Sequence, residues 1–223
     1  MKHQNNFEPS EEFAKTLEQL DNLRSIQASE KVSVAGVLGD IKPAAAVWLD
    51  ERARTDGGAD LLERLNLTVL PEEGNDNSYI IAKDTETAAR LAELFQKMRS
   101  RLERSRKEHD GRFDIGEVDE SVERQIGELL GYPATAIDYY VRRYRVRDET
   151  DEEADESFKR QIPASPINNG WIILSPEHWR EELEQYATPI WEATKQYFPK
   201  TARKLAVKSA GKRIISLFSR KKG

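Results

Sequence analysis

The sequence predicts an α+β protein that is mostly helical and contains a small antiparallel sheet. Apolar residues recur at the three-to-four-residue spacing of helices over most of the chain. Two short β-rich runs, 67–70 and 79–82, flank a loop of turn-forming residues and predict a hairpin. Capping residues, prolines and glycines stand where the helices are expected to begin and end.

The N-terminal region is expected to open with one long helix. Ser10 precedes two glutamates and is expected to cap a helix over 11–27, because acidic side chains favour the positive end of a helix. Gly36 and Gly39 are expected to interrupt any regular element within 32–40, since glycine is unfavourable inside helices and strands.

Further helices are expected on both sides of the hairpin. Pro43 is expected to begin a helix over 44–54, because its missing N–H is not needed at the first helical position. A short helix over 60–65 follows it. After the hairpin, Asp84 or Thr85 caps a long helix with an apolar face. The C-terminal half of that helix is rich in arginine, which suits the negative helix end.

The second half of the chain continues the helical pattern. Apolar residues within 122–130 predict a helix that ends at Gly131, and Pro133 begins the next one. The apolar run 171–174 predicts a buried strand. Two further helices are expected to begin near Pro176 and Pro189.

Charge and patterning divide the chain into four predicted parts. A helical and β-hairpin domain is expected over 1–147. An acidic loop follows over 148–157, where the acidic run is expected to stay solvated because it has nothing to bury. A strand and two helices are expected over 158–199, and the sequence leaves open whether they pack on the first part. A basic amphipathic tail helix is expected over 200–223.

Composition argues against several classes of function. The chain has no cysteine, so thiolate chemistry and cysteine-held metals are absent. Its three histidines form no close pair, and we expect neither a metal site nor a cofactor. No apolar run is long enough for a transmembrane helix, and the polar N-terminus does not resemble a secretory signal. These features predict a cytoplasmic protein, either free or peripheral to a membrane.

The basic tail is the strongest functional pattern in the sequence. Residues 200–223 hold nine lysines and arginines and no acidic residue, whereas the other 199 residues have a net charge of −14. On a helix, Val207, Ile214 and Phe218 fall on one arc and several cations on the opposite arc. The predicted binding residues of the tail are Lys204, Lys208, Lys212, Arg213 and Arg220.

These patterns favour a non-enzymatic binding or adaptor protein that uses this helix. Its partner would be an unknown protein or an anionic membrane surface, where each basic residue adds ~1 kcal/mol. Nucleic acid is an alternative partner, because lysine and arginine neutralise phosphates. The remaining interpretation is that the apolar arc simply docks on the core of the protein.

A second basic cluster lies between 139 and 147. Arginines, including Arg142 and Arg143, alternate there with tyrosines, and this mixture suits phosphate pairing and base stacking. The acidic run that follows would compete with phosphate for the same arginines. The cluster therefore supports the nucleic-acid alternative or a purely solvated helix end.

A predicted pocket corner supports a third class, an enzyme or a degenerate relative of one. Gly131, Tyr132 and Pro133 form a tight helix–turn–helix corner, in which glycine permits a positive φ. The interpretation requires a pocket where this corner meets Asp138 and the segment Lys42-Pro43. The alternative interpretation is a filled corner whose tyrosine packs inward.

The corner also carries a family resemblance. Leu-Leu-Gly-Tyr-Pro at 129–133 and Lys-Pro-Ala at 42–44 resemble an uncharacterised, mostly archaeal family of unknown function with a Gly-Tyr-Pro-x-Cys-Cys signature. The resemblance spans 37–144. The cysteine pair of the signature falls on Thr135 and Ala136 here, so any thiol or metal role that the family implies is lost. The resemblance implies no activity.

Overall fold

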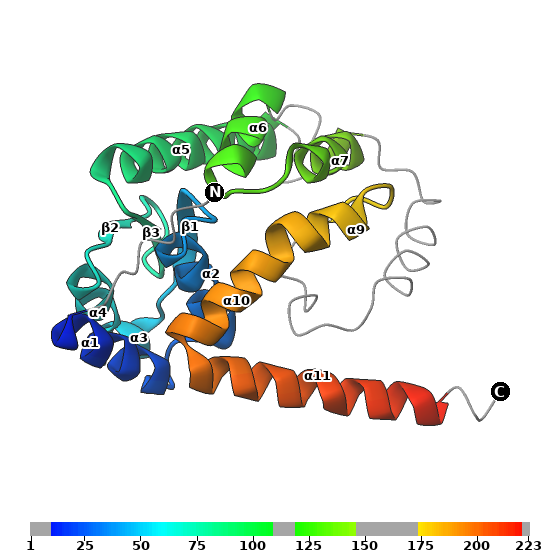
Figure 1. The fold of residues 1–223 in the computed structure, drawn as a ribbon. Coiled ribbons are helices and arrows are strands. Elements are labelled where there is room, and N and C mark those ends of the chain that lie inside the picture. The colour runs from blue at the N-terminus through cyan, green and yellow to red at the C-terminus, as the bar shows by residue number, and fades with distance from the viewer. Residues whose placement is uncertain (1–9, 109–118, 146–173, 220–223) are drawn as a thin grey trace, which may run out of the picture.

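The computed structural model describes residues 10–108, 119–145 and 174–219 (Figure 1). It confirms a mostly helical α+β fold with a small antiparallel sheet. The strands are β1 (Ala44–Trp48), β2 (Thr68–Pro71) and β3 (Ser78–Ala82). The helices are α1 (Glu11–Asn22), α2 (Ala28–Leu38), α3 (Glu51–Thr55), α4 (Gly58–Arg64), α5 (Thr85–Glu108), α6 (Glu120–Leu129), α7 (Ala134–Arg145), α9 (Trp179–Glu182), α10 (Thr188–Tyr197) and α11 (Pro199–Ser219), with a π-helical turn, η2 (Leu183–Ala187), between α9 and α10.

The three strands pair in the order β1-β3-β2, and both pairings are antiparallel. The hairpin of β2 and β3 confirms the sequence prediction. The helix predicted over 44–54 is wrong, because residues 44–48 form β1 and only α3 is helical. Ala44 pairs with Ala82 and Val47 with Tyr79, so pairing with β3 overrides the helix preference of the alanines. Asp50 accepts the Ala53 N–H and caps α3.

The region before the sheet also differs from the prediction. The helix predicted over 11–27 ends at Asn22, and a second helix, α2, covers most of 32–40. Gly36 lies inside α2 because the side chain of Lys42 fills the space beside it. A Cβ atom at Gly36 would lie 2.6 Å from Lys42 Cδ. The glycine therefore marks a close approach, and the helix continues through it.

Helices cover both faces of the sheet. Residues such as Val47 and Ile81 pack with α1, α2 and α4, whereas Ile80 and Ala82 pack with α5 and α6. Figure 1 shows this arrangement, with α5 and α6 above the strands and α1, α2 and α4 below them. The alternation follows from the period of two in a strand, which turns successive side chains to opposite faces.

The C-terminal helices add to the lower layer. α10 packs along α2, and α11 contacts α10, α1 and α2. A small apolar cluster joins them through Val32, Tyr186, Ile190 and Leu205. The predicted acidic loop 148–157 lies outside the described residues, as do residues 171–173 of the predicted strand 171–174.

A buried carboxylate ties α7 to α9. Glu182 is 2% exposed, and it accepts hydrogen bonds from Thr135 Oγ1 at 2.6 Å and from the Ser175 N–H at 2.6 Å. The Ser175 hydroxyl donates a third bond at 2.7 Å and caps the next turn by accepting the His178 N–H. The Glu182 carboxylate is therefore the acceptor for three hydrogen-bond donors.

We expect Glu182→Ala to lower the free energy of unfolding by about 3 kcal/mol or more, because it leaves these buried donors unpaired. Urea denaturation followed by circular dichroism measures the change. Glu184→Ala, at an exposed position two residues away, is the control and should stay within about 0.5 kcal/mol of the wild type. Equal losses in the two variants would contradict the structural role of Glu182.

Candidate functional site

α11 begins where its first turn meets the end of α1. Asp21 Oδ2 accepts the Lys200 N–H at 2.8 Å, and Asp21 Oδ1 accepts the Thr201 N–H at 3.0 Å and the Thr201 hydroxyl at 2.6 Å. A carboxylate in this position satisfies unpaired N–H groups and faces the positive helix end. Asp21 therefore caps a helix whose two N–H donors lie 179 and 180 residues later in the chain.

A buried lysine completes the junction from the other side. Lys31 Nζ donates to the carbonyl oxygens of Asp21 and Leu23, both at 2.9 Å, at the C-terminal end of α1. Burial lowers the pKa of Lys31, and the Asp21 carboxylate acts in the opposite direction. The junction thus holds the end of α1 and the beginning of α11 together through charged groups.

The first half of α11 docks through one narrow side. Thr201, Ala202, Leu205 and Ser209 are buried, whereas Lys204 and Lys208 are exposed. Val207, the first residue of the predicted apolar arc, is 73% exposed. With 3.6 residues per turn, position 207 lies on the side of the helix opposite to the buried stripe.

The docked stripe and Val207 lie on opposite sides of the first half of α11. The predicted apolar arc therefore does not dock on the core where it begins, and the amphipathic pattern of the rest of the helix stays a prediction. The side chains of Lys212 and Arg213, on the distal half, lie outside the described residues, as does Arg220. In Figure 1 the distal half runs away from α1 and α10 and ends at the tip of the molecule.

The structure brings part of the predicted pocket corner together. Gly131 has a φ of +76°, and a Cβ there would lie 2.9 Å from the Ile41 carbonyl oxygen. This close approach places Tyr132 beside Lys42, whose Nζ lies 5.8 Å from the centre of the tyrosine ring. The ring of Tyr186 lies 5.6 Å from that of Tyr132 on a tilted plane. The two prolines of the prediction, Pro43 and Pro133, directly precede β1 and α7.

Lys42 is unusual because its side chain is almost fully buried. Only 8% of the residue is exposed. Burial lowers the pKa of Lys42 to about 8, and the charge of Glu30 acts weakly in the opposite direction. Burial also raises the pKa of Tyr132, so the corner is held by an ammonium and a neutral phenol.

Asp138, the acid predicted for the corner, has a different partner. Its carboxylate accepts a hydrogen bond from Arg124, and this bond lowers the pKa of Asp138. Arg124 also pairs with Glu120, so the three side chains form an exposed ion-pair network between α6 and α7.

Tyr132 also lines a cavity of about 200 Å³. Its walls are mainly apolar and include Phe95, Met98, Ile126 and Ile137. Neither Lys42 nor Asp138 is among the residues that line it. The corner and the cavity therefore share only the tyrosine, and the predicted meeting of lysine, tyrosine and aspartate in one pocket is not formed.

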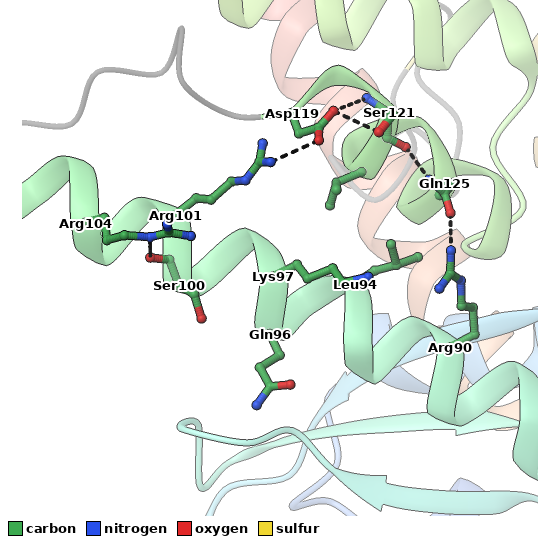
Figure 2. A pocket seen from close by; sticks show the side chains of 11 residues that line it. Arg90, Leu94, Gln96, Lys97, Ser100, Arg101, Arg104, Asp119, Ser121 and Gln125 are labelled. Atoms are coloured by element: carbon green, nitrogen blue, oxygen red, sulfur yellow. Dashed lines mark hydrogen bonds and ion pairs between the residues drawn. The ribbon is translucent and has the colours of Figure 1, made fainter.

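A larger cleft, of about 470 Å³, lies between α5 and the first half of α6. We call it the basic cleft, because four cations line it, namely Arg90, Lys97, Arg101 and Arg104. Figure 2 shows Arg90 and Arg101 reaching from α5 toward Gln125 and Asp119 on the α6 side.

Two carboxylates partly neutralise these cations. Glu93 pairs with Lys97 at 2.5 Å and with Arg90 at 3.0 Å, and these bonds lower the pKa of Glu93. Asp119 accepts the Ser121 N–H at 3.0 Å, which caps α6, and pairs with Arg101 at 3.1 Å. Its bonds to Ser121, with Arg101 as a smaller contribution, lower the pKa of Asp119.

Sequence reasoning missed the basic cleft, since it assigned the arginines of α5 to the negative helix end. The spacing of seven, four and three residues from Arg90 to Arg104 was the available signal, because it places the cations on one side of a helix. Of the second predicted cluster, Arg142 is exposed near the end of α7, and the Arg143 side chain lies outside the described residues.

Within the part of the chain that the structure describes, no group of three or more histidine or carboxylate side chains is placed to hold a metal ion. No helix there is long and apolar enough to span a bilayer. Comparisons of the chain with protein-family models, with curated proteins and with solved structures found no match.

We expect Asp21→Ala to lower the free energy of unfolding by about 2–3 kcal/mol, because it removes the cap of α11 and leaves the buried Thr201 hydroxyl without an acceptor. Urea denaturation measures the loss. Asp76→Ala, in the exposed hairpin loop, is the charge-matched control and should change stability by less than about 0.5 kcal/mol. If Asp21→Ala is as stable as the control, the cap does not hold α11.

The lowered pKa of Lys42 makes stability depend on pH. Between pH 8 and 10.5 the unfolded chain keeps a proton that the folded chain has released, so the free energy of unfolding rises with pH, by at most roughly 3 kcal/mol. Lys42→Met should be more stable than the wild type at pH 7 and should show a smaller rise.

Denaturation at several values between pH 7 and 9.5 tests this and avoids the opposing titration of buried tyrosines above pH 10. Lys31 contributes a rise of the same sign, so the informative quantity is the difference between the wild type and Lys42→Met. Lys15→Met, at an exposed position, should leave the pH profile unchanged. Parallel profiles for the wild type and Lys42→Met would rule out the expected titration.

Proposed function

We propose that this chain is a binding protein that attaches peripherally to anionic membranes through the outward side of α11. The observation that carries the proposal is the division of this helix into a docked side and an opposite, exposed side. Leu205 packs into the core, while Val207, two residues later, is 73% exposed. A single exposed valine is ordinary on a protein surface, and Val207 matters here because it begins a run of apolar residue types that continues at 214 and 218.

The exposed side begins with cations. Arg203 and Lys204 are exposed at the root of the helix, whereas the Lys200 ammonium is bound by Glu18 and Asn22 of α1. Each basic residue near an anionic bilayer contributes ~1 kcal/mol, and the 200–223 segment contains no acidic residue to oppose this attraction. The acidic remainder of the chain would be repelled by the same bilayer. In Figure 1 the distal half of α11 extends away from α1 and α10, so the repulsion from these helices is screened along it.

The same side continues with apolar residue types. At helical spacing, positions 207, 211, 214 and 218 follow one another along the helix, and the sequence places valine, glycine, isoleucine and phenylalanine there. Helices that lie in the headgroup region of a bilayer insert apolar residues and hold lysine and arginine against anionic lipids, and the sequence of α11 supplies both residue types. A nucleic acid would use the cations but would have no contact for the apolar strip, which favours the membrane over the nucleic-acid alternative.

The test is co-sedimentation of the full chain with vesicles that contain phosphatidylcholine alone or with 30% phosphatidylserine. We expect binding to the anionic vesicles only. Arg203→Glu/Lys204→Glu should weaken it at least tenfold, because each cation contributes ~1 kcal/mol and is replaced by a repelled charge. Val207→Asp should also weaken binding, since a carboxylate is expensive to bury in the interface.

Arg52→Glu/Arg54→Glu, at exposed positions of α3, makes the same change of charge away from α11 and should bind like the wild type. Thermal melting confirms that the variants remain folded. Equal binding to neutral vesicles, or equal loss in the α3 control, would refute the proposal. Binding that duplex DNA displaces completely would instead support the nucleic-acid alternative.

A further inference from the structure

We propose that the basic cleft between α5 and α6 binds a small ligand that carries two or more phosphate groups. This inference is independent of α11, because the cleft is built from residues 90–104 and 119–125. Its volume of about 470 Å³ lies within the roughly 300–1,000 Å³ of small-molecule sites.

The cations of the cleft form a continuous stripe. Arg90, Lys97, Arg101 and Arg104 fall on one side of α5, and at a rise of 1.5 Å per residue the stripe extends over roughly 21 Å. A single phosphate would meet only part of such a stripe. A ligand with several phosphates can engage neighbouring cations together, and arginine offers paired N–H donors that match phosphate oxygens.

The positive charge of the cleft exceeds its negative charge. Four cations face two carboxylates, Glu93 and Asp119. The side chains of Arg90, Lys97 and Arg101 are 38–51% exposed, so a ligand from solvent can reach them without opening the core. The negative charge of a polyphosphate would balance the excess positive charge of the cleft, which is otherwise solvated by water.

The other wall of the cleft adds neutral polar groups. Ser121 and Gln125 line it from the first half of α6, a helix of ten residues. Asp119 already caps the positive end of this helix, so a phosphate would be held by the side chains of the cleft. Figure 2 shows that Arg90, Gln125, Ser121, Asp119 and Arg101 are linked by hydrogen bonds and ion pairs around the cleft.

The composition of the lining identifies the class of ligand. Only Leu94 and Val122 contribute apolar side chains, and no aromatic side chain is among the lining residues. A single-stranded nucleic acid usually stacks its bases on aromatic side chains, and an acyl chain would need an apolar wall. Phosphate groups are therefore the part of the ligand that the cleft recognises.

Asp119 provides a specific test, because its carboxylate serves both the fold and the cleft. It caps α6 and also occupies Arg101. Asparagine is an equally good helix cap, so Asp119→Asn should keep α6 folded while it releases Arg101 for a ligand. Polyphosphate binding should then become at least threefold tighter, a gain that a structural role alone does not predict.

The experiment is isothermal titration calorimetry of the full chain with inorganic tripolyphosphate at low ionic strength. We expect saturable binding of one ligand. Lys97→Gln/Arg101→Gln should weaken it at least tenfold, and Arg52→Gln/Arg54→Gln, which removes the same charge from α3, should leave it unchanged. Arg203→Glu/Lys204→Glu should also leave it unchanged, so this test is separate from that of the membrane proposal.

The inference is overturned if the wild type shows no saturable binding, if both glutamine pairs weaken it equally, or if Asp119→Asn fails to tighten it. Circular dichroism melts identify any variant that has unfolded. If Lys97→Gln/Arg101→Gln unfolds, the binding measured for Asp119→Asn still decides the test. The source of the phosphates is tested in the Arg203→Glu/Lys204→Glu variant, so that α11 does not contribute to vesicle binding. Binding of a soluble inositol polyphosphate is compared with binding of vesicles that carry the same headgroup. The comparison shows whether a free ligand or a lipid supplies the phosphates. Selective loss in Lys97→Gln/Arg101→Gln supports the inference for either source.

Discussion

The placement of α11 depends on a single carboxylate, that of Asp21. This side chain lies at the end of the first helix and accepts two backbone N–H groups and a hydroxyl from the first turn of the last helix. A buried carboxylate is stable only when its oxygens accept hydrogen bonds, so the donors of α11 must lie within hydrogen-bond distance of Asp21. The cap therefore sets both the position and the direction of α11. The burial of Leu205 and the exposure of Val207 both follow from that direction.

A second close contact fixes the sheet against the helices on either side. The stem of Lys42 fills the space that Gly36 leaves in α2, and the backbone at Lys42 lies against Gly131 after α6. Both glycines permit an approach that a Cβ would block. Burial of the lysine is unfavourable for its charge, as its lowered pKa shows, and the face of Tyr132 compensates only in part. The corner that the sequence suggested as a pocket is thus largely a packing junction.

Local signals predicted most of the helices and the hairpin, whereas non-local contacts decided the errors. Caps such as Ser10 and Asp84 act within one turn, so the sequence predicts them directly. Ala44–Trp48 became a strand because β3 was available to pair with it, and no pattern inside the segment contains that information. Asp138 was misplaced for the same reason, since its partner Arg124 lies on another helix. The basic cleft needed both the spacing along α5 and the position of α6, and only the spacing is visible in the sequence.

The two basic surfaces can act on an acidic protein because electrostatic attraction is local. At physiological ionic strength charges are screened over about 8 Å, so a phosphate in the cleft interacts with the cations that line it and very little with the net charge of −5. The same argument holds for the distal half of α11, which extends away from α1 and α10 in Figure 1. Overall acidity then opposes non-specific attachment of the rest of the surface to polyanions. Under both proposals, separation of charge places anion binding at two sites, one on α11 and one between α5 and α6.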